Sequence, residues 1–370
     1  MDAVNGYGVS ALRDLYDRPG PYASVYASVR PTGEQDVLPR WRALATELTR
    51  QGAGTGLVEV VHDRVLAEVP GPGVLAVYAA GEDVLLAVTM PGSAQPDLAR
   101  YGALPHLLPL LEWLQDRPAY LTALVDRTGA DITLHPGGTA SPVQWTVEGP
   151  DDEIERNAPG GWSQRRYQTR AEDSWEHNAV AVVEALVPVI NEHAVPLLVL
   201  AGDVRALQYL EKHLPVGVTR QITIRHVSGS RSPDGSDPLR AEQIADAVRL
   251  TVADQTASLL AQFDEERSPG GRAVEGVAPT LEAFRESRVG VLLLARDVGD
   301  ARTAWFGIDP TTVADVPEDL ERAGVQPQRG PLMDVAVRSA LLTRAGVRIL
   351  ENSGAPEAPV EGIGALCRFA

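Results

Sequence analysis

This chain of 370 residues contains one cysteine and one lysine, and no hydrophobic run approaches the roughly 20 residues that a membrane-spanning helix needs. Because Cys367 has no partner within the chain, an intramolecular disulfide and a metal site built from clustered cysteines are both excluded. The N-terminus has no basic segment followed by an apolar one, so a secretory signal peptide is not expected. Together these absences favour a cytoplasmic protein.

Positive charge is also scarce. The 50 acidic residues outnumber the 33 basic ones, which leaves a formal net charge of −17, and every basic residue except Lys212 is arginine. An acidic balance of this size argues against a protein that coats nucleic acid along its whole surface. It leaves room for a local basic contact.

The length and the 44% hydrophobic content predict two or three packed domains with an α/β (mixed α+β) fold. We expect an N-terminal α/β domain over residues 1–118. A middle domain over 119–235 should combine a mixed sheet with helices and a loop containing two glycines. A C-terminal domain over 236–370, a small α/β sandwich, should be entered by a long helix. A new pattern of strands begins near residue 120, and a Ser, Gly, Pro and Asp-rich stretch at 228–238 indicates an exposed loop.

Hydrophobic periodicity predicts the individual elements. Helices are expected over residues 9–16, 38–50, 54–68, 174–193, 204–214, 239–266, 280–287 and 334–345, and residues 104–114 close the first part. Strands are expected over residues 22–29, 74–80, 84–89, 121–126, 131–135, 144–148, 196–201, 218–227, 289–295, 303–307 and 348–350. Two pairs of these strands flank short turn sequences and read as hairpins.

Residues 157–172 are the most informative stretch. Gly160 and Gly161 give two adjacent backbone positions freedom to adopt positive φ, and Gln164 supplies a neutral amide. Three arginines then follow in a chain that is otherwise acidic: Arg165, Arg166 and Arg170. A flexible tip with a polar amide and a basic stem suits insertion into a place rich in phosphate.

This stretch also has plainer interpretations. Glycine pairs are common in ordinary surface turns, and the arginines could form a solvated face paired with Glu172 or Glu176. We favour phosphate contact, because arginine is suited to bidentate phosphate binding. Trp162 fits equally well as a buried anchor of the loop or as a stacking partner for an exposed base.

Two other motifs carry less weight. Asp173, Glu176 and His177 have metal-like spacing on one helical face, but no His-Glu-x-x-His pattern accompanies them, and a solvated helix start is preferred. The glycine-rich run 52–56 resembles a phosphate loop, yet it follows a helical pattern instead of a strand, which favours a helix stop and restart. We therefore expect no metal and no cofactor.

The run Gly160-Gly161-Trp162-Ser163-Gln164-Arg165-Arg166-Tyr167 resembles the Gly-Gly-Gln loop of archaeo-eukaryotic class I peptide release factors. A second segment supports the resemblance: Phe263-Asp264-Glu265, the glycines at 270 and 276, and Thr280-Leu281-Glu282-Ala283 are similar to the entry into that family's last domain. The resemblance covers about residues 119–369. It is nearest to the bacterial, actinobacterial-type relatives, which include Balon-like ribosome hibernation factors, and more distant from Pelota.

The sequence departs from the family in three respects. Trp162 and Ser163 stand between the glycines and Gln164, so the amide comes two positions late. The family's stop-codon-reading motifs need a lysine in an Asn-Ile-Lys-Ser run and a cysteine in the first domain. Here the lone lysine is Lys212 and the lone cysteine is Cys367. Codon-specific termination is therefore not expected.

The resemblance implies a cytoplasmic translation factor that occupies the ribosomal A site, with the middle-domain loop at the peptidyl transferase centre, in hibernation or protection under stress. The alternatives are codon-independent peptidyl-tRNA hydrolysis in ribosome rescue and a non-ribosomal RNA-binding stress protein. The implied partners are the ribosome and a translational GTPase such as elongation factor Tu. The catalytic candidates are Gly160, Gly161 and Gln164, and the rRNA-binding candidates are Trp162, Ser163, Arg165, Arg166, Tyr167 and Arg170.

Overall fold

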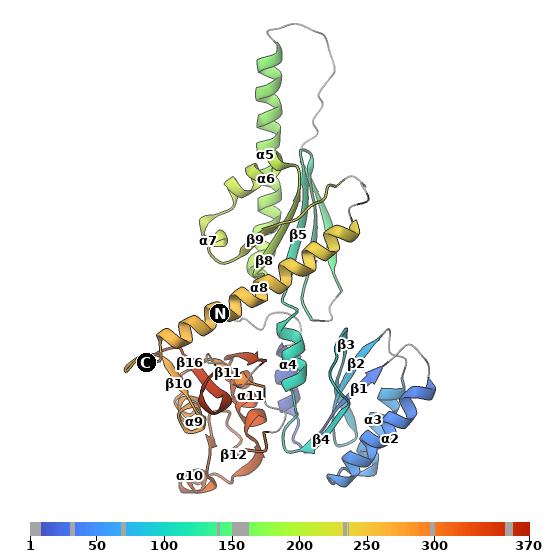
Figure 1. The fold of residues 1–370 in the computed structure, drawn as a ribbon, viewed down its shortest axis with the longest axis vertical. Helices are drawn as coiled ribbons and strands as arrows, with labels where there is room; N and C mark the ends of the chain where they lie inside the picture. The colour runs from blue at the N-terminus through green and yellow to red at the C-terminus, as the bar shows by residue number, and fades with distance from the viewer. Residues whose placement is uncertain are drawn as a thin grey trace. The chain divides into compact units, whose positions relative to one another are not determined.

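The computed structural model describes residues 9–29, 34–67, 72–138, 141–149, 163–231, 235, 237–296, 300–351 and 358–370. These residues form a mixed α/β protein, which confirms the predicted fold class (Figure 1). They fall into two compact units, one formed by residues 9–115 together with 256–370 and the other by residues 116–255. The division into three domains at about residues 118 and 235 stays a prediction.

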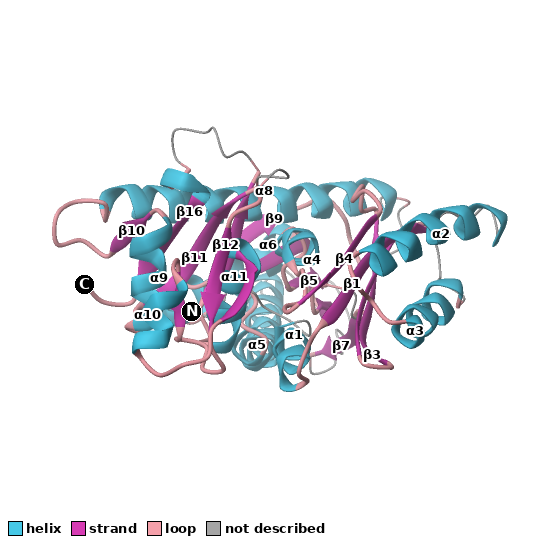
Figure 2. Cartoon of the chain, turned by 90° about the horizontal axis from the view of Figure 1, so that it is seen from below, coloured by secondary structure: helices cyan, strands magenta, loops and turns pink. Residues whose placement is uncertain are grey.

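A four-stranded antiparallel sheet, in the order β3-β2-β1-β4, organises the N-terminal part of the first unit. Alternate residues of β1 point to opposite faces, as in any strand. α2 and α3 cover one face of this sheet (Figure 2). Ala23 and Val25 belong to the core on that face, whereas Tyr26 belongs to a separate core. The elements of this part are α1 (Val9–Asp14), η1 (Leu15–Asp17), β1 (Tyr22–Val29), α2 (Glu34–Arg50), α3 (Thr55–Leu66), β2 (Gly73–Ala80), β3 (Asp83–Pro91), β4 (Leu98–Gly102) and α4 (Leu108–Gln115).

The glycine-rich run between α2 and α3 is a helix stop and restart, as predicted. α2 ends at Arg50, Gly52 adopts a φ of 99°, and α3 begins at Thr55 behind Gly54. Glycine tolerates this positive φ without the clash that a side chain would cause.

The C-terminal part of the first unit contains two sheets, β10-β16-β11-β15 and the smaller antiparallel β13-β12-β14. In the larger sheet β11 pairs with β15 in parallel and with β16 in antiparallel orientation. The elements are α8 (Asp237–Glu265), whose last residues belong to this unit, β10 (Ala273–Glu275), α9 (Val277–Arg285), β11 (Val289–Ala295), β12 (Thr303–Phe306), β13 (Val313–Ala314), α10 (Pro317–Arg322), β14 (Gln328–Pro331), α11 (Leu332–Leu342), β15 (Gly346–Leu350), η2 (Val360–Gly362) and β16 (Ile363–Cys367).

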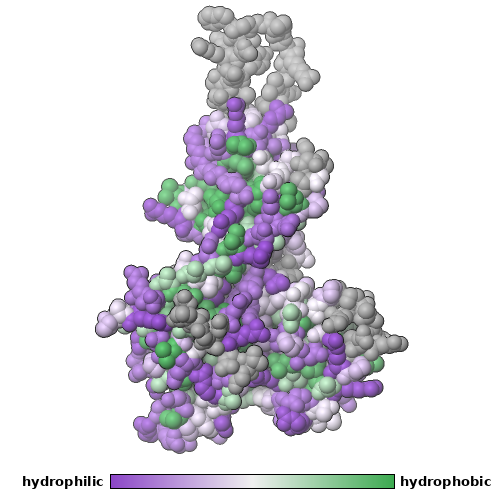
Figure 3. Space-filling view, viewed as in Figure 1, coloured by the Kyte–Doolittle hydropathy of each residue, from purple (hydrophilic) through white to green (hydrophobic). Residues whose placement is uncertain are grey.

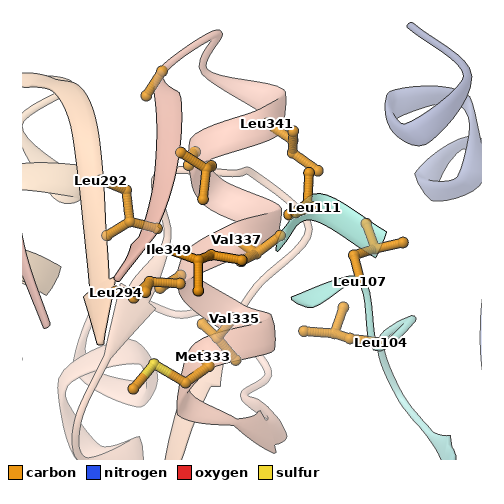
Figure 4. Close-up of a cluster of buried hydrophobic side chains, with 14 of the residues drawn as sticks. Leu104, Leu107, Leu111, Leu292, Leu294, Met333, Val335, Val337, Leu341 and Ile349 are labelled. Carbon is orange, nitrogen blue, oxygen red and sulfur yellow. The ribbon is translucent and has the colours of Figure 1, made fainter. Parts of the chain in front are cut away.

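The two parts of the first unit share one hydrophobic core. Leucines that follow β4 pack beside apolar residues of α11 (Figure 4). The side chain of Gln115 adds two hydrogen bonds to the backbone of β15, because its amide donates to the carbonyl of Ile349 at 2.8 Å and its oxygen accepts from the Ile349 N–H at 2.9 Å. The residues shown in this contact are Leu104, Leu107, Leu111, Val335, Val337 and Leu341.

The second unit is built on a mixed sheet in the order β7-β6-β5-β8-β9. β5, β6 and β7 are antiparallel neighbours, while β8 runs parallel to both β5 and β9. α5 and α6 cover one face, and α8 packs on the other through Ala247 against Leu197 and Val199. The elements are β5 (Tyr120–Asp126), β6 (Gly129–His135), β7 (Val143–Glu148), α5 (Ser163–Glu192), β8 (Leu197–Gly202), α6 (Val204–His213), α7 (Val216–Thr219) and β9 (Thr223–His226).

Two predicted elements of this unit were wrong in extent. The strand expected over residues 218–227 is shorter, because a helical turn, α7, starts behind Pro215 and leaves only Thr223–His226 to pair with β8. Proline has a fixed φ that suits a helix start. The helix expected to begin at residue 174 begins at Ser163 instead.

The surface turned to the viewer in Figure 3 is largely hydrophilic, with smaller hydrophobic areas among the polar residues. Within the part of the chain that the structure describes, no helix is long and apolar enough to cross a membrane.

Candidate functional site

Helix α5 links the hydrophobic core of the second unit to the residues that the sequence singles out. Its C-terminal half carries an apolar stripe at helical spacing that packs against the sheet. Asn178 and Ala179 are its first buried residues among those whose side chains are described. The N-terminal half of α5 extends beyond the end of the sheet (Figure 1). The buried stripe consists of Ala179, Val182, Val183, Leu186 and Ile190.

Most of the predicted site residues lie in the first two turns of α5. Ser163, Gln164, Arg165, Arg166, Tyr167 and Arg170 all have helical backbone, so the expectation that Gln164 and the arginines belong to a loop was wrong. The reason is local: residues 163–172 contain no glycine or proline, and Gln, Arg, Ala and Glu are good helix formers. Gly160, Gly161 and Trp162 lie outside the described residues.

Helical geometry sets how the arginines are distributed. Arg166 and Arg170 are four residues apart, which puts them on one side of the helix. Arg165 stands one position earlier, about 100° around the axis. Three cationic residues therefore share the first turns of a helix that has no acidic residue in its first turn.

Glu176, one of the residues with metal-like spacing, makes ion pairs instead. Its Oε1 accepts from Lys212 Nζ at 2.7 Å and from His213 Nε2 at 2.8 Å, which ties α5 to the end of α6. The hydrogen bonds from Lys212 and then His213 lower the pKa of Glu176. Among the residues that the structure describes, no group of three or more His, Cys, Asp or Glu side chains could hold a metal ion.

The turn between β5 and β6 contacts the middle of this helix, at the base of its projecting N-terminal half. Asp126 Oδ1 accepts hydrogen bonds from the Thr128 N–H at 2.8 Å and from Thr128 Oγ1 at 2.7 Å. The next carbonyls of the turn hold the two neighbouring segments. Arg127 O accepts from Asn178 Nδ2 of α5 at 2.6 Å, and Thr128 O accepts from the Gly149 N–H at 2.8 Å.

Arg231, which precedes α8 in the chain, completes this network. Its Nη1 donates to Asp126 Oδ1 at 2.9 Å and to Thr128 Oγ1 at 3.0 Å, while Nη2 donates to Asp131 Oδ1 at 3.1 Å. The Arg231 side chain is 15% exposed. Burial by itself would raise the pKa of Asp126, but hydrogen bonds from Thr128 and Arg231 outweigh burial and lower it below its ordinary value.

Sequence reasoning found the turn but missed this cluster. The Arg127–Ala130 segment reads as a hairpin turn, and nothing in that pattern indicates that Asp126 accepts hydrogen bonds from Arg231, 105 positions away. The sequence also does not predict the buried contact of Asn178, because a polar residue within an amphipathic helix is ordinarily assigned to the solvated side. In the structure it is 2% exposed.

Residues 119–269 match the model of bacterial archaeo-eukaryotic release factor family 2. Over these residues the match bears out the resemblance to bacterial relatives of the archaeo-eukaryotic release factors that the sequence indicates. An uncharacterized protein of Mycobacterium tuberculosis strain H37Rv, Rv2629, is 27% identical over 366 residues, which are 97% of this chain and 96% of that protein.

Solved structures of release-factor-like proteins are also similar to this chain. The archaeal translation termination factor aRF1 gives a TM-score of 0.25 at 15% identity, with 97% of this chain and 96% of that chain covered. Pelota of Archaeoglobus fulgidus gives 0.33 at 12% identity, covering 99% and 94%. Dom34 of S. cerevisiae gives 0.36 at 12% identity, covering 80% and 79%.

Proposed function

We propose that this protein occupies the ribosomal A site, with the N-terminal end of α5 and the segment before it at the peptidyl transferase centre, and that it protects idle ribosomes. The proposal rests on the release-factor family match over residues 119–269 together with the basic turns of α5. Its function would then be ribosome hibernation under stress.

The single observation that carries the proposal is the location of three arginines at the start of a helix. Cations are unfavourable near a helix N-terminus, because the macrodipole leaves partial positive charge there. Arg165 and Arg166 nevertheless lie in the first turn of α5, with Arg170 one turn further along, in a chain of net charge −17. An external polyanion resolves this conflict, and rRNA phosphate is the polyanion that the family relationship suggests.

Occupation is preferred to peptide release because of where Gln164 lies. Catalysis requires a reacting group to be held within a fraction of an ångström of its productive position, and a shift of about 1 Å can cost ~100-fold in rate. Two residues separate Gln164 from Gly161, and its backbone is helical. We therefore expect weak or absent peptidyl-tRNA hydrolysis. Rapid release from programmed ribosomes, lost in Gln164→Ala, would favour the ribosome-rescue alternative instead.

The test of ribosome binding is co-sedimentation with purified ribosomes over a series of salt concentrations. Changing Arg165, Arg166 and Arg170 together to alanine should weaken binding at every salt concentration. It should also flatten the plot of log binding constant against log salt by about 2 units, since each lost phosphate contact on single-stranded nucleic acid removes ~0.7.

A matched control removes the same charge elsewhere in the second unit. Arg205, Arg220 and Arg249 are exposed, and their joint replacement by alanine should leave the salt slope unchanged. If both triple variants lose the same affinity, net charge alone governs binding and the proposed site is wrong. If neither variant loses affinity, the arginines of α5 do not contact the ribosome.

We also propose that a translational GTPase such as elongation factor Tu delivers this protein through its C-terminal part. Ile308 is 91% exposed and is followed by Asp309, while Asp315, Glu318 and Glu321 are exposed nearby in sequence. An apolar anchor beside acidic side chains suits a basic partner surface, because complementary charge speeds association and selects partners. These features support an interface around α10.

Isothermal titration of the full chain with elongation factor Tu tests this partner. Glu318→Lys combined with Glu321→Lys should lower the affinity, most strongly at low salt. Glu59→Lys combined with Asp63→Lys changes the charge equally on α3, where both residues are exposed, and should have little effect. No heat with the unmodified protein would rule out this GTPase as the partner.

A further inference from the structure

Gly149, directly after β7, and Asn178, in the middle of α5, are attached to the same turn. Gly149, directly after β7, donates its N–H to Thr128 O at 2.8 Å. Asn178 of α5 donates Nδ2 to Arg127 O at 2.6 Å. The two attachments therefore use adjacent carbonyls of the β5–β6 turn. We call Asp126, Arg127, Thr128, Gly149, Asn178 and Arg231 the anchor cluster.

Gly149 and Asn178 also touch each other. An added Cβ on Gly149 would lie 1.6 Å from Asn178 Oδ1, so any larger residue must displace that side chain. The Asn178 side chain is buried and bonded to Arg127 O, and it cannot move aside without breaking that bond. Only glycine fits here while α5 keeps its present position against the turn.

Arg231 holds the turn itself in place. Its guanidinium bridges the carboxylates of Asp126 and Asp131, which come from β5 and β6 respectively. Asp131 Oδ1 additionally accepts from Thr146 Oγ1 of β7 at 2.9 Å. The hydrogen bonds of Arg231 to the two strands are charge-assisted and therefore stronger than bonds between neutral groups. The base on which α5 rests is therefore cross-linked across three strands.

The length of α5 magnifies any change at this base. From Asn178 back to Ser163 the helix rises about 22 Å, so a tilt of about 10° at the base displaces the tip by about 4 Å. None of the described side chains of α5 before Asn178 is buried. Beyond the buried stripe, the anchor cluster and the Glu176 ion pairs to α6 are therefore the described contacts that set the direction of the arginine-bearing turns.

We propose that Asn178 and Arg231 are positioning residues that hold α5 in one direction relative to its sheet and so pre-organise the arginine-bearing turns for binding. The part of this inference that concerns ribosome binding rests on the proposed function. Its structural claim, a fixed helix direction, can be measured without ribosomes. Pre-organisation raises affinity because a larger fraction of the molecules already has the helix direction that binding requires.

Pulsed electron paramagnetic resonance measures the direction of the helix. Spin labels at Gln168→Cys on α5 and Arg205→Cys on α6, in a Cys367→Ser background, should give a narrow distance distribution. Asn178→Ala should broaden it, and Gly149→Ala should shift it. The double variant should be no worse than the more disruptive of the two single variants, since both act on the same contact. Arg231→Gln should broaden the distribution, and Arg231→Lys should restore it in part.

Asn191→Ala provides the matched control, because Asn191 is exposed at the other end of α5. Circular dichroism establishes that each variant is folded. A distribution for folded Asn178→Ala and folded Arg231→Gln as narrow as that of the control would overturn the inference.

Ribosome affinity then separates the two proposals. If the competent direction becomes one tenth as populated, the apparent dissociation constant of Asn178→Ala should rise roughly tenfold. A broadened distribution with unchanged ribosome affinity would keep the anchor but contradict its role in binding. Unchanged affinity in the triple arginine variant would contradict the proposed function instead.

Discussion

His106 Nδ1 lies 2.9 Å from Asp334 Oδ1, although the two residues are 228 positions apart in the chain. The Asp334 side chain is 2% exposed and that of His106 is 10% exposed. The backbone of His106 is held as well, since its N–H donates to Ser24 Oγ at 2.9 Å and its carbonyl accepts from Tyr26 at 2.8 Å. This polar contact inside the shared core joins the N-terminal sheet to α11. The N-terminal and C-terminal parts of the first unit should therefore unfold together.

We predict that His106→Ala destabilises the first unit strongly. Removing one partner of a buried pair leaves the other without compensation, and such losses cost about 3 to 5 kcal/mol. The free energy of unfolding is measured by urea denaturation followed by tryptophan fluorescence. His193→Ala, at an exposed histidine of the second unit, should remain within about 0.5 kcal/mol of the unmodified protein. Equal stability of the two variants would contradict the shared-core interpretation.

The anchor cluster should contribute a stability that depends on pH. The folded pKa of Asp126 is lowered, so its contribution is present above the unfolded pKa of about 3.9 and is lost as the pH falls through the folded value. The difference in unfolding free energy between the protein and Asp126→Asn should therefore be largest above about pH 5 and shrink below about pH 4.

Glu184→Gln serves as the control for this pH series. Glu184 is an exposed carboxylate on α5, and its replacement should give a small difference that changes little with pH. A difference for Asp126→Asn that stays constant from pH 7 to pH 3 would show that its hydrogen bonds do not favour the charged form.

Gly202 should tolerate no side chain. It adopts a φ of 133°, and an added Cβ would lie 1.8 Å from the carbonyl oxygen of Val125 on the neighbouring strand. We expect Gly202→Ala to lower the melting temperature of the second unit sharply, with a loss of more than about 2 kcal/mol. Gly217→Ala is the contrasting change, because Gly217 lies in α7 with open space around it. Comparable melting temperatures for both variants would refute this argument.

Local sequence patterns predicted the helices and strands well where the hydrophobic periodicity matches the buried face of the element. β1 occupies residues Tyr22–Val29 as expected, and β11 occupies Val289–Ala295, because unbroken apolar or alternating runs favour strands whatever lies around them. Short strands were missed, among them β4 and β16. Each of these depends on hydrogen bonds from strands distant in the chain, and β16 pairs with β11 some seventy positions earlier.

The candidate site divides in the same way. The amino-acid sequence shows that glycines, an amide and three arginines stand together in an acidic chain, and that this run resembles a release-factor loop. Those properties depend on neighbours along the chain. That Asn178, Gly149 and Arg231 meet at the β5–β6 turn, and that His106 meets Asp334, is seen only in the folded structure. Such contacts are made by residues more than 25 positions apart. They depend on strand order and helix packing, which leave no periodic pattern in the sequence.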